Sequence, residues 1–179
     1  MMASISKSLF ILLILTSQIS CAQRKAKYYT VSGTVTSTSS YCGGARPTDE
    51  MMAELAKPKP EAGKQLFLKS GKENSKSNSI IISFNSDSLG QFNIKLKNGT
   101  YCIVEEYKSK ALAIPKNDEN SKWDEKCLTE EYARCDYQLE VNNKNVDGVN
   151  INFHKPCQWS TPCLQYGGPL PPSAPPPGR

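Results

Sequence analysis

The side chains most able to do chemistry in this chain are its thiols and its single imidazole. Six of the seven cysteines lie beyond the first 22 of 179 residues, and they are Cys42, Cys102, Cys127, Cys135, Cys157 and Cys163. They could form disulfides, hold a metal or carry electrons. Cys127 lies eight positions before Cys135, and His154 lies near Cys157 and Cys163. Neither group has the paired C-x-x-C spacing typical of zinc sites, so a metal is the less favoured use.

The first 22 residues have the features of a secretory signal peptide. Lys7 supplies a positive start, and a strongly apolar run follows at 9–15. This run is too short for a membrane span, which needs ~20 residues, but it fits the apolar region of a signal. Two endings stay open. Cleavage after Ala22 is ordinary secretion, whereas a lipoprotein-type ending, which we prefer, would make Cys21 a lipid anchor despite the unusual Gln18. Either route predicts export.

Export to an oxidising compartment favours disulfides over metal thiolates for the remaining six cysteines. Fifteen connectivities are possible, and the sequence does not choose among them. A local bridge between Cys157 and Cys163 is the single pair we expect most. We expect no bridge between Cys127 and Cys135. In a continuous helix they would lie ~12 Å apart along the axis, whereas a disulfide tolerates a Cα separation of at most ~7 Å.

No motif for acid–base or nucleophilic catalysis is present. Glu105 and Glu106 are neighbours in an expected strand and should point to opposite faces, so they do not form an acid–base pair. The chain lacks the G-x-S-x-G, H-E-x-x-H and phosphate-loop motifs. We expect His154 to be a solvated surface residue. The sequence therefore predicts no enzyme and no cofactor, with a hydrolase as the least favoured alternative.

Apolar residues alternate with polar ones in seven short runs, which is typical of strands with one buried and one solvated face. Asn98-Gly99 separates two of them and is a strong hairpin signal. The runs cover residues 29–36, 64–69, 79–84, 92–96, 100–107, 137–141 and 149–154. Together they predict an all-β fold, a seven-stranded antiparallel sandwich.

Two segments depart from this pattern. Residues 48–57 start with an N-cap threonine followed by acids, and residues 121–135 are rich in helix formers. Both are expected to be short helical excursions. The expected organisation is a signal peptide at 1–22, a tether at 23–27, a sandwich at 28–156 and a Cys/Pro-rich tail at 157–179. The tail is expected to be extended from Gly167 onward.

Four short motifs occur in an order found in a known family. They are Val31-Ser-Gly-Thr-Val35, Ala62-Gly63-Lys64, Ser86-Asp87-Ser88-Leu89-Gly90-Gln91-Phe92 and Gly99-Thr100-Tyr101. The set resembles the carboxypeptidase regulatory-like domain, a transthyretin-like sandwich of many bacterial envelope proteins. The resemblance covers roughly residues 28–107, and the run at 149–153 fits the closing strand. It implies a transthyretin/Ig-like fold and a non-catalytic accessory, interaction or surface role.

The family pattern turns Tyr101 and Ile103 into the core, which leaves Cys102 on the outer face of its strand. An outward cysteine is useful where another segment covers that face. We expect Cys102 to bind one of Cys42, Cys127 and Cys135, and the bridge to stabilise the fold by ~2–4 kcal/mol.

These observations predict a non-enzymatic exported protein, a disulfide-stabilised structural or binding module of the cell envelope. It would sit in the periplasm or outer membrane as a lipoprotein, or else be secreted. An unidentified protein or glycan is the expected partner, and a membrane contact would run through lipidated Cys21. The formal net charge of +5 is too weak and dispersed to suggest nucleic acid. A cysteine-based redox or metal carrier is the main alternative.

Overall fold

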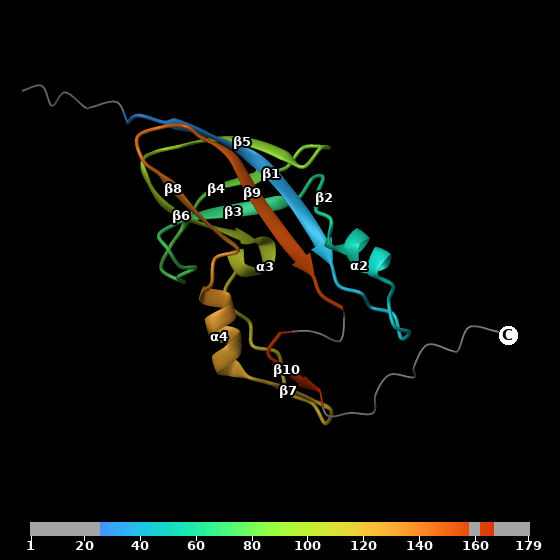
Figure 1. The fold of residues 1–179 in the computed structure, drawn as a ribbon. Coiled ribbons are helices and arrows are strands. Elements are labelled where there is room, and N and C mark those ends of the chain that lie inside the picture. Colours follow the sequence, from blue (N-terminus) through green and yellow to red (C-terminus); the bar gives the residue numbers. More distant parts are fainter. Residues whose placement is uncertain (1–25, 158–161, 167–179) are drawn as a thin grey trace, which may run out of the picture.

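A computed structural model describes residues 26–157 and 162–166 of the chain (Figure 1). The expected signal peptide, Cys21, most of the tether and most of the expected tail lie outside these ranges. The described part of the tail contains Cys157, Cys163 and the strand β10. Strands and short helices make up the described part in the order β1 (Tyr29–Ser39), α2 (Asp49–Ala56), β2 (Lys59–Pro60), β3 (Gln65–Ser70), β4 (Ile80–Asn85), β5 (Gln91–Leu96), β6 (Gly99–Glu105), α3 (Glu106–Ser109), β7 (Ser121–Trp123), α4 (Glu125–Ala133), β8 (Tyr137–Val141), β9 (Val146–Lys155) and β10 (Leu164–Tyr166).

Seven of these strands correspond to the seven predicted runs, but the predicted total was wrong. The described residues hold ten strands, because β2, β7 and β10 are two- or three-residue strands without room for a hydrophobic alternation. The expected strand at 100–107 ends at Glu105, and α3 begins at the next residue. An ion pair across one turn of α3, from Lys110 Nζ to Glu106 Oε1 at 2.8 Å, favours this turn of helix.

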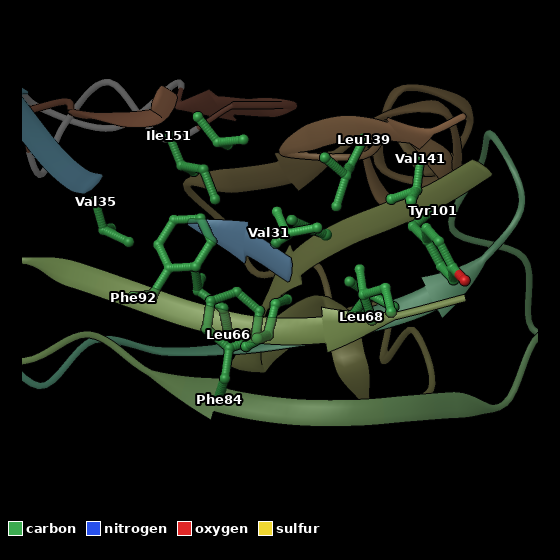
Figure 2. Packing of buried hydrophobic residues seen from close by; sticks show 14 of the residues in the cluster. Val31, Val35, Leu66, Leu68, Phe84, Phe92, Tyr101, Leu139, Val141 and Ile151 are labelled. Atoms are coloured by element: carbon green, nitrogen blue, oxygen red, sulfur yellow. The ribbon is translucent and has the colours of Figure 1, made fainter. Parts of the chain in front are cut away.

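Two four-stranded sheets face each other across one core. One sheet has the antiparallel order β4-β3-β6-β8. In the other, β1 pairs with β5 and β2 along one edge and with β9 along the opposite edge. Inward side chains of both sheets form a single cluster (Figure 2), which includes Val31, Val35, Phe92, Ile151, Leu66, Leu68, Ile103 and Val141. The described chain is therefore an all-β, sandwich-like fold.

The sequence predicted a purely antiparallel sandwich, and this was wrong. The sandwich is mixed, because β1 and β9 run parallel. Their register pairs Gly33 with Val149 and Thr38 with His154. A bulge before Gly33 brings the two backbones so close that a Cβ at Gly33 would lie 2.0 Å from the Val149 carbonyl oxygen. A residue without a side chain is required at this point, as is usual where a second backbone approaches a strand.

The outer face of the β4-β3-β6-β8 sheet is covered, so β6 is buried on both sides. Four consecutive residues of β6, at 101–104, are buried, which an exposed outer face would not allow. Figure 1 shows α3 beside this sheet and α4, β7 and β10 at one end of the molecule. The 71–79 loop, α3 and α4 form the layer that covers this face, and Asn74 of the loop bonds to Lys69 of the sheet and to the backbone of α3 and α4.

The two helical excursions differ in how well the sequence predicted them. Helix α2 begins after Thr48, whose Oγ1 accepts a hydrogen bond from Met51 N at 3.3 Å, as expected of an N-cap. The second excursion is not one helix. Residues 121–123 pair with β10, and Asp124 then caps the shorter α4. No helix in the described ranges is long and apolar enough to cross a membrane.

Candidate functional site

Three disulfides join the six cysteines: Cys42–Cys157, Cys102–Cys135 and Cys127–Cys163. Their Cα separations of 5.5, 5.3 and 5.5 Å lie within the normal range. Cys102 is paired with one of the three partners that the sequence left open. Cys127 and Cys135 belong to different bridges, as predicted. The continuous helix on which that prediction rested was wrong, because α4 ends at Ala133 and Cys135 lies beyond it. Three bridges in one small fold fit an oxidising compartment.

The expected local bridge between Cys157 and Cys163 was wrong. Cys157 follows β9, and Cys42 follows the parallel strand β1, so the two chain segments leave the sheet side by side. A hydrogen bond from Ser40 N to Lys155 O at 2.9 Å holds them together there. Cys163 instead precedes β10 and lies against the start of α4, where Asp124 N donates to its carbonyl oxygen at 3.0 Å. Tertiary proximity outweighed the short sequence separation.

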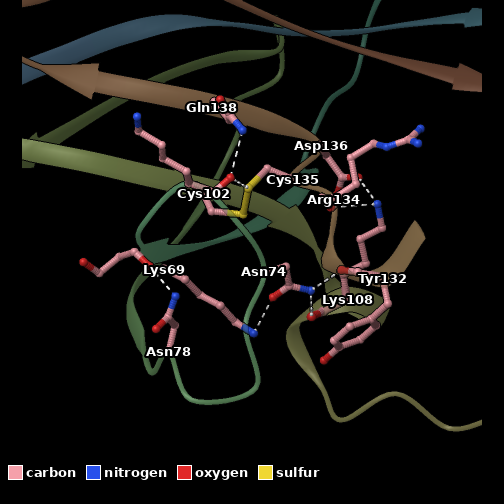
Figure 3. The surroundings of a disulfide bond; sticks show 12 residues. Lys69, Asn74, Asn78, Cys102, Lys108, Tyr132, Arg134, Cys135, Asp136 and Gln138 are labelled. Carbon is pink, nitrogen blue, oxygen red and sulfur yellow. Dashed lines mark hydrogen bonds and ion pairs between the residues drawn. A yellow bond between two sulfur atoms is a disulfide. The ribbon is translucent and has the colours of Figure 1, made fainter. Parts of the chain in front are cut away.

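A buried polar cluster lies beside the Cys102–Cys135 bridge (Figure 3). Asn74, which is 2% exposed, donates from Nδ2 to the carbonyl oxygens of Lys108 and Tyr132 at 2.9 and 2.8 Å. Its Oδ1 accepts a hydrogen bond from Lys69 Nζ at 2.7 Å. Lys108 Nζ in turn donates to Asp136 Oδ1 at 2.7 Å. The cluster ties the 71–79 loop, α3 and α4 to the sheet.

An apolar groove opens between α3, the segment that follows it, β7 and α4. Its volume is about 560 Å³, and only three of its lining residues are charged. The side chains that shape its floor and walls are Tyr107, Leu112, Trp123, Leu128, Tyr132 and Pro162. Cys163 also lines the groove, so the Cys127–Cys163 bridge forms part of its wall. The volume and lining fall in the range of small-molecule sites.

A serine and a histidine meet where β1 and β9 end. His154 is exposed, and its Nε2 lies 2.8 Å from Ser40 Oγ while its Nδ1 lies 3.1 Å from Thr38 Oγ1. Sequence reasoning missed this nucleophile–base pair because the two residues are 114 positions apart. The group behind the imidazole is a hydroxyl rather than a carboxylate, so the arrangement lacks the acid of a catalytic triad.

Three carboxylates line one hollow of about 690 Å³, namely Glu61, Glu105 and Glu106. The strand alternation that was expected to turn the last two to opposite faces does not apply, because β6 ends at Glu105 and α3 begins at Glu106. Each carboxylate has a lysine partner, in the pairs Glu61–Lys155, Glu105–Lys64 and Glu106–Lys110. Hydrogen bonds from Lys155 and Ser37 lower the pKa of Glu61, and one from Lys110 lowers the pKa of Glu106. A glycosidase needs one ionised carboxylate and one carboxyl whose pKa is raised so that it stays protonated, and the pKa values of Glu61 and Glu106 are shifted in the other direction.

Comparisons of the chain with protein-family models, with curated proteins and with solved structures find no match. The resemblance to the carboxypeptidase regulatory-like domain therefore stays a prediction from the motifs.

Proposed function

We propose that this protein is an exported, non-enzymatic binding module of the cell envelope whose ligand enters the apolar groove beside α4. The observation that carries the proposal is the groove itself, an apolar hollow of about 560 Å³ with disulfide-fixed walls. Hollows of this volume with a mostly apolar lining are typical of small-molecule sites. The family resemblance supports the same non-catalytic role.

The groove favours an apolar small molecule as the ligand class. Aromatic and aliphatic side chains dominate its lining, and burying apolar surface is the main source of affinity in such a site. A glycan, one of the partners expected from the sequence, would need more polar groups than the lining offers. Export would place the protein in the periplasm, on the outer membrane through lipidated Cys21, or outside the cell.

Replacing Leu112 by glutamate should weaken binding of a neutral apolar probe. N-phenyl-1-naphthylamine fluoresces when it enters apolar sites, and a carboxylate in the groove would have to lose its water shell. We expect Leu112→Glu to lower the probe's affinity by about tenfold or more. The matched control is Ile114→Glu, two residues along the same segment, because Ile114 is exposed and does not line the groove. Equal affinities for the two variants and the unmodified protein would contradict the proposal.

The hydrolase alternative depends on Ser40 and His154, and it can be tested directly. An exposed imidazole without a carboxylate behind it should activate the serine hydroxyl poorly. We expect the protein and its Ser40→Ala variant to hydrolyse p-nitrophenyl acetate at the same slow rate, measured as nitrophenolate release. A Ser40-dependent rate about tenfold above that of the variant would show an enzyme instead.

The redox or metal-carrier alternative needs free thiolates. All six cysteines beyond residue 22 are joined in disulfides in the described residues, so this alternative has less support than the binding module.

A further inference from the structure

Lys69 is a charged residue that the fold buries on the outer face of a sheet. It lies on β3, in register with Cys102 of β6, and its side chain is 4% exposed. The layer above it, the 71–79 loop with α4, is fastened by the Cys102–Cys135 bridge. A lysine on an open strand extends its ammonium into water. Here the covering layer prevents that, and burial lowers the pKa of Lys69 from its usual value.

The Lys69 ammonium lacks a counter-charge among the described residues. Its hydrogen bond goes to a neutral amide oxygen, Asn74 Oδ1, at 2.7 Å (Figure 3). The carboxylates of the described chain make no ion pair with it, whereas the neighbouring Lys108 is paired with Asp136. An ammonium has three hydrogens to donate, and a buried charge without an ion partner is costly. The buried Lys69 ammonium therefore lacks a negative partner among the described residues.

Lys69 lines a hollow of about 280 Å³ at the edge of this covering layer. The other polar side chains around it are Lys76, Lys110, Asn78, Ser79, Ser109 and Tyr132. The hydroxyls of Ser109 and Tyr132 already donate to the carbonyl oxygens of Glu106 and Lys110, so the ammonium groups, the Asn78 amide and the Ser79 hydroxyl remain as donors. Among the described residues, Lys110 has the carboxylate of Glu106 as a partner, while Lys76 has none. No acidic side chain lines the hollow. Its chemistry is that of an anion site, with positive charge, an amide and the Ser79 hydroxyl around one opening.

We propose that this hollow binds an oxyanion, a sulfate, phosphate or carboxylate group, between the buried Lys69 and the exposed Lys76. The bound group supplies the counter-charge that Lys69 lacks. It is either a free inorganic ion or the charged end of a larger ligand. One larger ligand could occupy both places, because the hollow and the apolar groove adjoin at Lys110, Ala111 and Tyr132.

Titration of the protein with inorganic sulfate at low ionic strength tests the proposal by calorimetry and by backbone amide NMR. We expect shifts to centre on residues 76–80 and 109–111. Lys69→Met, which removes the charge and keeps an apolar side chain of similar length, should weaken binding by about tenfold or more, and Lys76→Met by about threefold. The matched control is Lys72→Met, an exposed lysine of the same loop outside the hollow, which should stay within about twofold.

A second arm separates the two sources of the anion. Octyl sulfate, used below its micelle-forming concentration, should bind more tightly than sulfate if the anion is the end of a ligand that also fills the groove, and Leu112→Glu should abolish the gain. Equal affinities would indicate a free ion. Sulfate binding that Lys69→Met leaves unchanged, or amide shifts that lie elsewhere, would overturn the anion site without bearing on the groove.

Discussion

Replacing both Cys102 and Cys135 by alanine should lower the free energy of unfolding by about 3–4 kcal/mol. The bridge closes a loop of 33 residues and ends on a fully buried position of β6. Its loss frees the unfolded chain and removes the attachment of the covering layer. For a domain of this size the midpoint of thermal unfolding should fall by about 10–20 °C. Far-UV circular dichroism during heating measures it.

The matched control for this experiment is the double replacement of Cys127 and Cys163. That bridge spans 36 residues, so its effect on the unfolded chain is nearly the same. It holds only the β7–β10 pair and the start of α4, which can open locally while the sandwich stays folded. We expect a midpoint within about 5 °C of the unmodified protein, together with loss of apolar-probe binding in the groove. An equal fall for both variants would show that the appendage and the sandwich unfold as one unit.

Asn74→Ala should destabilise the protein by about 3–5 kcal/mol, although the side chain contains only one amide group. In a buried place the Asn74 amide accepts one hydrogen bond from the Lys69 ammonium and donates to two carbonyl oxygens. All three groups lose their partner when it is removed, and one of them is charged. Urea unfolding, followed by circular dichroism, gives the change in free energy.

Asn78→Ala is the control for that measurement. Asn78 lies in the same loop, but its side chain donates a single hydrogen bond, to Ser70 O at 2.7 Å, at an exposed site. We expect a loss of about 1 kcal/mol or less. Similar losses for the two asparagines would mean that the polar cluster beneath the covering layer contributes little to stability.

The predictable parts of this fold are those that depend on residues close together in the sequence. Apolar residues at alternate positions indicate which face of a strand is buried, and this pattern predicted the seven long strands. The start of α2 was predictable from Thr48 because an N-cap acts within three residues. The same reasoning failed for the short strands β2, β7 and β10, which are formed by a pairing partner rather than by their own sequence.

Residues of the candidate sites were harder to predict, because what matters is the layer that covers them. Lys69 stands at an outward position of a strand, where a solvated lysine is the ordinary expectation. It is buried because Asn74, Tyr132 and Cys135 come to lie above it, and two of these are more than 60 positions away. Ser40 and His154 likewise meet only through the parallel register of β1 and β9.

The sequence by itself determined the all-β character, the positions of seven strands, the use of cysteines in bridges and the separation of Cys127 from Cys135. The tertiary structure alone decided which cysteines pair, that position 33 requires glycine, and where the apolar groove and the buried Lys69 lie. The reason is one of range. Alternation and capping act over a few residues. Distant segments must pack together before a disulfide can join residues 115 positions apart, or before the Val149 carbonyl oxygen can lie 2.0 Å from the place of a Cβ at Gly33.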